Sequence, residues 1–315
     1  MDIKESARHL LKGCMAVKAG ESVLIITDNQ MPSSISESLF NAALEENAVP
    51  AILKIKAGKV PSEEPAKAVA EAMLGFDVIV APTAKSLTHT QARLNATKNG
   101  ARIATLPGIT ENMMTSGGIT ADYNEIAKSA LKIHNLLKKT KKIRVTSAKG
   151  TDITFDVDPD MWHVDTGMCM KKGDFTNLPG GEIFIAPYDA NGRYFIDGSI
   201  GDFGLLDTPI EVVVEGRMAT KIAGNRAEKL AETLDAKGRN GRNIAELGIG
   251  LNPRSKLIGN ALEDEKVKGT VHIAFGDNST FGGDIQAGIH IDGIIQDVKV
   301  YLDGKQIELE NFGYV

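Results

Sequence analysis

In the first 140 residues, stretches with apolar residues at every third or fourth position alternate with short runs that are apolar throughout. The first pattern is typical of amphipathic helices, and the second of strands that are buried on both faces. We expect helices at 3–17, 33–47, 64–74, 86–100 and 121–140, and strands at 22–28, 50–56, 76–82 and 101–107. Because helices and apolar strands alternate, residues 1–140 are predicted to form a Rossmann-like or flavodoxin-like α/β domain with a parallel sheet.

From residue 141 the pattern changes to short β-branched runs that are separated by glycines. Strands are expected around a Lys-Gly turn within 142–158 and at 181–187, 192–200, 210–218, 270–276 and 290–308, with one helix at 225–236. Frequent turns between short strands are typical of mixed or antiparallel sheets. Residues 141–315 are therefore predicted to form a second domain of mixed α+β structure, and a chain of 315 residues is long enough for two domains.

Neither charge nor motif indicates a nucleotide or nucleic-acid partner. The turn after the first strand reads TDNQMPSS and lacks the glycine pattern of a phosphate-binding loop. The net charge is -5, and the one basic cluster, Lys138, Lys139, Lys141 and Lys142, is interpreted as a solvated helix end. We therefore expect a partner that is a small molecule or a short peptide.

The distribution of apolar residues also argues against a membrane protein. No apolar run approaches the ~20 residues that span a bilayer, and the N-terminus has charges throughout. The two cysteines, Cys14 and Cys169, do not make a disulfide framework. A cytoplasmic location without a membrane partner is the expectation.

The segment His290-Ile291-Asp292 carries the clearest indication of chemistry. It lies in an apolar, β-branched run that predicts a strand, and residues two apart in a strand point to the same face. An imidazole and a carboxylate would thus project side by side from a rigid backbone. This pair is half of a metal site, or two thirds of a facial triad if another histidine joins it.

Three more segments of the second half place metal-ligating residue types beside glycines. Glu182 begins a strand after a Pro-Gly-Gly turn, Glu246 precedes an expected glycine-rich turn, and His272 lies inside a strand. Taken singly, each has a structural explanation, as a solvated glutamate or a hydrogen-bonded core histidine. Taken together with the His-x-Asp pair, they favour a metal site, and His163, beside Trp162, is a further candidate for lining its cleft.

The order N-x-P-x-G-E, E-x-G-I-G-x-N, H-x-A-x-G and H-x-D, between Asn177 and Asp292, resembles the aminopeptidase T family of thermophilic leucyl aminopeptidases. The resemblance implies a homodimeric, metal-dependent aminopeptidase that releases N-terminal residues from peptides. It also implies two divalent ions (zinc, cobalt or manganese) with the ligands Glu182, Glu246, His272, His290 and Asp292. Asp277 and Asp284, on glycine-rich turns near these residues, are candidates for the general base.

Two departures from that family point to an alternative. The chain is shorter than usual members, and the stretch 272–280 lacks the tyrosine that the family places after the third-motif histidine. Shorter relatives of the same fold resemble 2,5-dihydroxypyridine dioxygenases, which use one non-haem Fe(II) held by two His and one Asp. His272, His290 and Asp292 would supply that set. Aminopeptidase activity is the leading expectation, ring cleavage by a dioxygenase is the alternative, and a non-enzymatic small-ligand-binding protein is the third.

Overall fold

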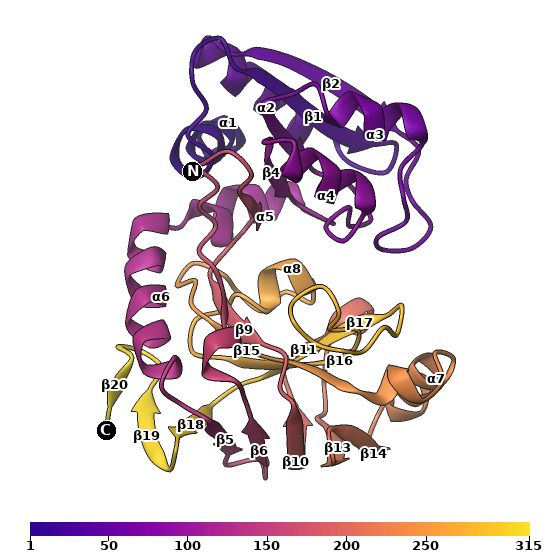
Figure 1. The fold of residues 1–315 in the computed structure, drawn as a ribbon, viewed down its shortest axis with the longest axis vertical. Helices are drawn as coiled ribbons and strands as arrows, with labels where there is room; N and C mark the ends of the chain where they lie inside the picture. The colour runs from indigo at the N-terminus through magenta and orange to yellow at the C-terminus, as the bar shows by residue number, and fades with distance from the viewer. The chain divides into compact units, whose positions relative to one another are not determined.

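The computed structural model (Figure 1) describes residues 1–201 and 203–315 and the backbone of residue 202. The chain divides into two compact units, of which the first comprises 1–124 and 165–180 and the second comprises 125–164 and 181–315. Compared with the predicted boundary at residue 140, residues 125–140 belong to the second unit and residues 165–180 to the first. The division into domains at residue 140 stays a prediction.

The first unit is built on a parallel sheet of five strands in the order β2-β1-β3-β4-β8. The strands are β1 (Ser22–Asp28), β2 (Val49–Ile55), β3 (Val78–Ala81), β4 (Arg102–Thr105) and β8 (Phe175–Asn177). The helices are α1 (Ile3–Arg8), α2 (Ser33–Glu45), α3 (Lys67–Met73), α4 (Gln91–Lys98) and α5 (Glu111–Ser116). The six residues of β1 after Ser22 are all buried, as expected for a strand that is covered on both faces.

The first expected helix changes character part-way. Asp2 and Glu5 form a capping box at its start, and residues 3–8 are α-helical. Residues His9–Cys14 continue as a π-helix with buried Leu10, Leu11 and Cys14. The helix expected at 86–100 begins later, at Gln91, because the Thr90 side chain accepts a hydrogen bond from Arg93 N and caps it there.

The second unit contains two larger sheets, whose strand pairs with assigned register are all antiparallel within the described residues. The eight-stranded sheet has the order β14-β13-β10-β6-β5-β18-β19-β20. Its strands are β5 (Lys142–Ser147), β6 (Asp152–Asp156), β10 (Asp189–Ile196), β13 (Ile210–Glu215), β14 (Met218–Ala223), β18 (Val298–Leu302), β19 (Lys305–Glu308) and β20 (Gly313–Tyr314). The combination of a parallel sheet with antiparallel sheets confirms the expected mixed α/β class.

The other sheet has seven strands in the order β12-β11-β17-β16-β15-β9-β7. They are β7 (His163–Asp165), β9 (Glu182–Ile185), β11 (Ser199–Ile200), β12 (Gly204–Leu205), β15 (Ile244–Gly250), β16 (Val271–Gly276) and β17 (His290–Ile295). Helices α6 (Tyr123–Leu137), α7 (Ala227–Asp235) and α8 (Ala261–Asp264) complete the chain. Among the described residues, no helix is long and apolar enough to cross a membrane.

The two faces of the seven-stranded sheet differ, since one packs in the core and the other carries polar side chains. On one face, Phe275 of β16 packs against Tyr194 of β10, with ring centroids 6.2 Å apart, so this face forms the core with the eight-stranded sheet. Since neighbouring residues of a strand point to opposite faces, His272 and Ala274 project from the other side of β16. The alternation therefore reserves one face for packing and leaves the other for polar side chains.

The apolar run 290–308 does not form one continuous strand. It divides into β17, β18 and β19, and the chain passes from the seven-stranded to the eight-stranded sheet between β17 and β18. Asp297, in that connection, has a φ of 50°, a left-handed conformation that turns the backbone sharply. In the same way, the expected strand 192–200 divides into the end of β10 and β11, which belong to different sheets.

Candidate metal centre

Four adjacent strands of the seven-stranded sheet, in the order β17-β16-β15-β9, carry the metal-ligating residues that the sequence indicates. Asp292 pairs with Ala274, which in turn pairs with Glu246. Further along β15, Gly248 pairs with His272 of β16, and Gly250 pairs with Glu182 of β9. Residues paired across a sheet point to the same face, so the fold brings five side chains together on the face opposite the core: Glu182, Glu246, His272, His290 and Asp292.

A glycine in β15 makes room for the central imidazole. A Cβ atom on Gly248 would lie 1.9 Å from His272 Nε2, which no side chain tolerates. The expectation of a glycine-rich turn after Glu246 was therefore wrong. Residues 244–250 form a fully buried strand, and the glycine at 248 serves close approach rather than chain reversal.

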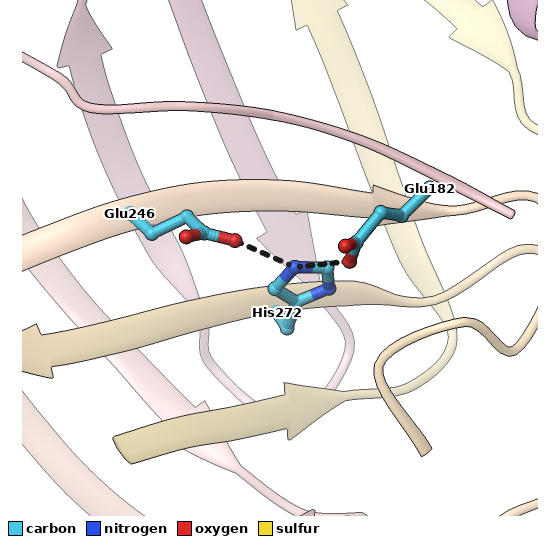
Figure 2. A group of neighbouring side chains, drawn as sticks. All are labelled: Glu182, Glu246 and His272. Carbon is cyan, nitrogen blue, oxygen red and sulfur yellow. Dashed lines mark hydrogen bonds and ion pairs between the residues drawn. The ribbon is translucent and has the colours of Figure 1, made fainter. Parts of the chain in front are cut away.

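The ligand atoms lie at the distances that neighbouring ligands of one ion would have. His272 Nε2 is 3.1 Å from Glu246 Oε1 and 3.4 Å from Glu182 Oε2 (Figure 2). His290 Nε2 is 3.6 Å from Glu246 Oε2 and 3.5 Å from Asp292 Oδ1. Two ligands that each lie ~2.1 Å from an ion at right angles are about 3 Å apart. Glu246 thus belongs to two groups whose ligand atoms lie within 4.8 Å of one another, Glu182–Glu246–His272 and Glu246–His290–Asp292.

The hydrogen bonding within the cluster also fits a metal ion. Glu182 Oε2, His272 Nδ1 and Asp292 Oδ1 are buried and make no hydrogen bond. Buried polar atoms are nearly always satisfied, so unsatisfied carboxylate oxygens that converge on imidazoles are the arrangement that a cation would complete. Nitrogen and carboxylate oxygen together suit zinc, manganese or ferrous iron.

His290 is oriented for binding by a main-chain group. Its Nδ1 lies 2.8 Å from the carbonyl oxygen of Asp277, which accepts the Nδ1 proton and leaves the Nε2 lone pair directed at the cluster. The side chain of His290 is 30% exposed, whereas that of His272 is fully buried. Solvent therefore reaches the cluster on the His290 side.

The two aspartates that were candidates for the general base do not join either group. The Asp277 carboxylate accepts hydrogen bonds from Ser279 Oγ and from the amides of Ser279, Ala287 and Gly288, so it shapes its own loop. Asp284 is paired with Arg217 at 2.8 Å, and its side chain is 74% exposed. What Asp277 contributes to the cluster is its carbonyl oxygen.

Charges within the cluster shift the pKa values of its members strongly. Burial opposes a charge on His290, but the Asp292 and Glu246 carboxylates outweigh burial and raise the pKa of His290 to about 10. The pKa of Asp292 is held far below its usual range, because the His290 and His272 imidazoles outweigh the effect of burial. Burial raises the pKa of Glu182 to about 8, although the nearby Lys266 opposes that rise.

Lys266 and Glu265 are part of the cluster, and sequence reasoning missed both. Lys266 Nζ is fully buried and lies 2.6 Å from Glu182 Oε1 and 2.5 Å from Glu265 Oε1. Both residues come from the charged run Glu-Asp-Glu-Lys at 263–266, which looks like an ordinary solvated turn. No signal in that run distinguishes a buried lysine from an exposed one.

Aromatic rings lie beside the exposed side of the cluster. Phe281 contacts His290 edge-on, with ring centroids 5.8 Å apart, and Phe184 at 5.5 Å. His163 stacks on Phe184 at 5.3 Å, and its Nε2 lies 2.9 Å from the carbonyl oxygen of Phe281. His163, a candidate for lining the site, is thus linked to the cluster through two phenylalanines.

Comparison with known proteins identifies the family. The family model described as 2,5-dihydroxypyridine 5,6-dioxygenase (NicX) matches residues 2–310. The chain is a member of this dioxygenase family. A search of curated proteins found no match.

Two solved structures share the fold over almost the whole chain. The 2,5-dihydroxypyridine dioxygenase from Pseudomonas putida KT2440 is 19% identical, with a TM-score of 0.83 over 97% of this chain and 95% of that chain. AmpT, an aminopeptidase T from Thermus thermophilus, is 14% identical, with a TM-score of 0.71 over 98% of each chain. The suspected relationship to the dioxygenases is confirmed by the family model, and the fold is shared with AmpT.

The family match also corrects the leading functional expectation. The resemblance to aminopeptidase T was taken to imply peptide hydrolysis, but the family model that covers residues 2–310 is that of the dioxygenases. The aminopeptidase expectation was therefore wrong. The dioxygenase and AmpT structures share this fold, and a shared fold does not imply a shared reaction.

Proposed function

We propose that this protein is a mononuclear non-haem Fe(II) dioxygenase that cleaves the ring of a dihydroxypyridine-like substrate. The match of the dioxygenase family model to residues 2–310 carries the proposal. The donor set of the cluster agrees with it, since two imidazoles and one carboxylate form the facial set typical of such oxygenases.

In this proposal His272, His290 and Asp292 would hold the iron. The structure groups His272 with Glu182 and Glu246, and His290 with Asp292 and Glu246, so Glu246 lies between the two imidazoles. Bound Fe(II) would supply the one-electron chemistry that lets dioxygen react with an aromatic ring. Glu246 Oε1 and Oε2 lie 3.1 Å from His272 Nε2 and 3.6 Å from His290 Nε2, so this carboxylate holds both rings in place. In this proposal its carboxylate would accept the proton that a ring hydroxyl releases on binding.

The surroundings of the cluster suit a flat, aromatic substrate. Phe281 lies beside His290, whose side chain is partly exposed, and Phe184 packs against Phe281. Aromatic rings favour offset-stacked or edge-to-face contacts with one another, worth about 0.5–1.5 kcal/mol beyond burial. The fully buried His272, by contrast, keeps its side of the cluster away from water.

The test is dioxygen consumption by the protein loaded anaerobically with Fe(II). With 2,5-dihydroxypyridine, we expect one dioxygen consumed for each substrate lost, measured with an oxygen electrode and by the decay of the pyridine absorbance. His290→Ala is the matched control and should show neither. Substrate that remains unchanged in the iron-loaded wild type would refute the proposal.

A further inference from the structure

A buried ammonium group lies on a carboxylate of the metal cluster. Lys266 follows helix α8 and is completely shielded from solvent. Its Nζ atom is 2.6 Å from Glu182 Oε1 and 2.5 Å from Glu265 Oε1, so it links two carboxylates. A buried lysine is retained only where its charge is compensated, and here Glu182 and Glu265 compensate it.

Without this lysine, the residues of the cluster would suit two ions. The groups Glu182–Glu246–His272 and Glu246–His290–Asp292 share Glu246, as two ions bridged by one carboxylate would. Ions in dinuclear sites lie about 3.5–4 Å apart and each needs its own anionic ligands. In the first group, those ligands are Glu182 and Glu246.

We propose that the Lys266 ammonium takes the place of a second metal ion and restricts the cluster to one. Of the two oxygens of Glu182, one is bonded to Lys266, and the other lies 3.4 Å from His272 Nε2. An ion that bound Glu182 at ~2.0–2.2 Å would stand within a few ångströms of the ammonium. Repulsion between a divalent ion and a fixed positive charge is strong where water is excluded.

The residues around Lys266 agree with a fixed cation. Glu265 is the second carboxylate that Lys266 contacts, and its side chain is only 15% exposed. Lys266 is therefore held between two largely buried carboxylates, and its ammonium stays beside Glu182. Lys266 acts on Glu182 and so determines the number of ions without being a ligand.

This inference deepens the proposed function, because a mononuclear iron site requires that only one position be filled. The test does not depend on turnover. Redox-stable Mn²⁺ is titrated into the metal-free protein by equilibrium dialysis, with elemental analysis of the ion per chain. Wild type is expected to bind one ion per chain.

Removing the charge should open the second position. Lys266→Met keeps a similar length, and we expect it to bind two Mn²⁺ per chain, the second at least about tenfold tighter than any second ion on wild type. The double variant Lys266→Met/Glu265→Gln removes the whole ion pair and serves if the single variant folds poorly. It is also expected to bind two Mn²⁺ per chain. Lys268→Met is the matched control, since Lys268 contacts Glu310 at 3.9 Å with Glu310 84% exposed, and it should bind one ion.

Two results would overturn the inference. One is two Mn²⁺ per chain on wild type, seen also as two anomalous peaks in crystals soaked with Mn²⁺. The other is a folded double variant that binds one ion or none. A wild type that binds one ion but consumes no dioxygen with a dihydroxypyridine would instead refute the proposed function and leave the role of Lys266 intact.

Discussion

At the scale of single residues, variants of His290 and Glu246 distinguish a ligand of the proposed iron from a residue beside it. His290→Ala removes the imidazole whose Nε2 lies 3.5 Å from Asp292 Oδ1, and we expect Fe(II) binding at micromolar concentration to be lost. Glu246→Gln keeps the size and hydrogen bonding of the side chain, so the affinity for Fe(II) should fall by about 10–100-fold at most. Anaerobic Fe(II) titration measures both affinities.

The exposed Asp284→Asn serves as the control for these two variants, since its side chain is paired with Arg217 away from the cluster. It should bind iron as wild type does. Loss of iron from Glu246→Gln as complete as that from His290→Ala would make Glu246 a ligand and contradict the assignment.

The raised pKa of His290 predicts that metal affinity depends on pH. In the metal-free protein the pKa of His290 is raised to about 10, because the Asp292 and Glu246 carboxylates outweigh burial. The stabilisation of the protonated form is therefore complete below an ordinary histidine pKa of ~6.5 and is lost as the pH rises through 10. A metal ion must displace this proton, so its affinity should rise by roughly tenfold per pH unit between these values.

Calorimetric titration with Mn²⁺ between pH 6 and 8, in buffers of different ionisation enthalpy, checks this sign and counts the protons released. His290→Ala is not informative here, because it lacks the site. An affinity that stays constant over this interval would show that His290 is neutral in the metal-free protein.

At the scale of elements, strand β15 is fitted to its neighbour β16 through Gly248. A Cβ at this position would lie 1.9 Å from His272 Nε2, so Gly248→Ala must displace either the imidazole or the strand. We expect a loss of about 1–3 kcal/mol in the free energy of unfolding, typical of overpacking, together with weaker metal binding. Urea denaturation and Mn²⁺ titration measure the two effects.

Gly75→Ala is the matched control, because its nearest atom, Ala72 O, would be 3.6 Å from the added methyl group. Its stability should stay within about 0.5 kcal/mol of wild type. Normal metal affinity in Gly248→Ala would mean that the sheet relaxes without moving His272.

At the scale of the whole molecule, the thiols report on the unfolding of the first unit, in which both cysteines lie. Cys14 and Cys169 are 1% and 0% exposed, and burial raises the pKa of Cys169 to about 12. Since the thiolate is the reactive form, neither should react rapidly with a disulfide reagent at pH 8 in the native state. Two thiols per chain should react in denaturant, followed by the absorbance of the released thiolate.

Fast reaction of one cysteine in native buffer would contradict this expectation and would show local opening around it. Cys14→Ser identifies which cysteine reacts. It also controls for the small stability change that loss of a buried thiol brings.

The sequence by itself determined the elements that depend on local pattern. Apolar runs such as 22–28 form strands because their side chains bury on both faces, and the His-x-Asp spacing places His290 and Asp292 on one face because strands have a period of two. The order of four motifs pointed to the dioxygenase family and to AmpT, which shares the fold. It did not decide between them, because the same metal-ligating residue types suit more than one metal-dependent reaction.

Only the tertiary structure decided the features that depend on contacts between distant segments. The run 290–308 passes from one sheet to another at Asp297, and residues 175–177 pair with β4 as a fifth strand of the parallel sheet. In neither segment does the local sequence pattern show which strand it will pair with. The glycine at 248 has its reason in an imidazole 24 residues away in the chain, across a strand pair. Lys266 looks like any surface lysine until folding brings Glu182 to its ammonium, because burial and charge compensation are properties of the assembled sheet rather than of the local sequence.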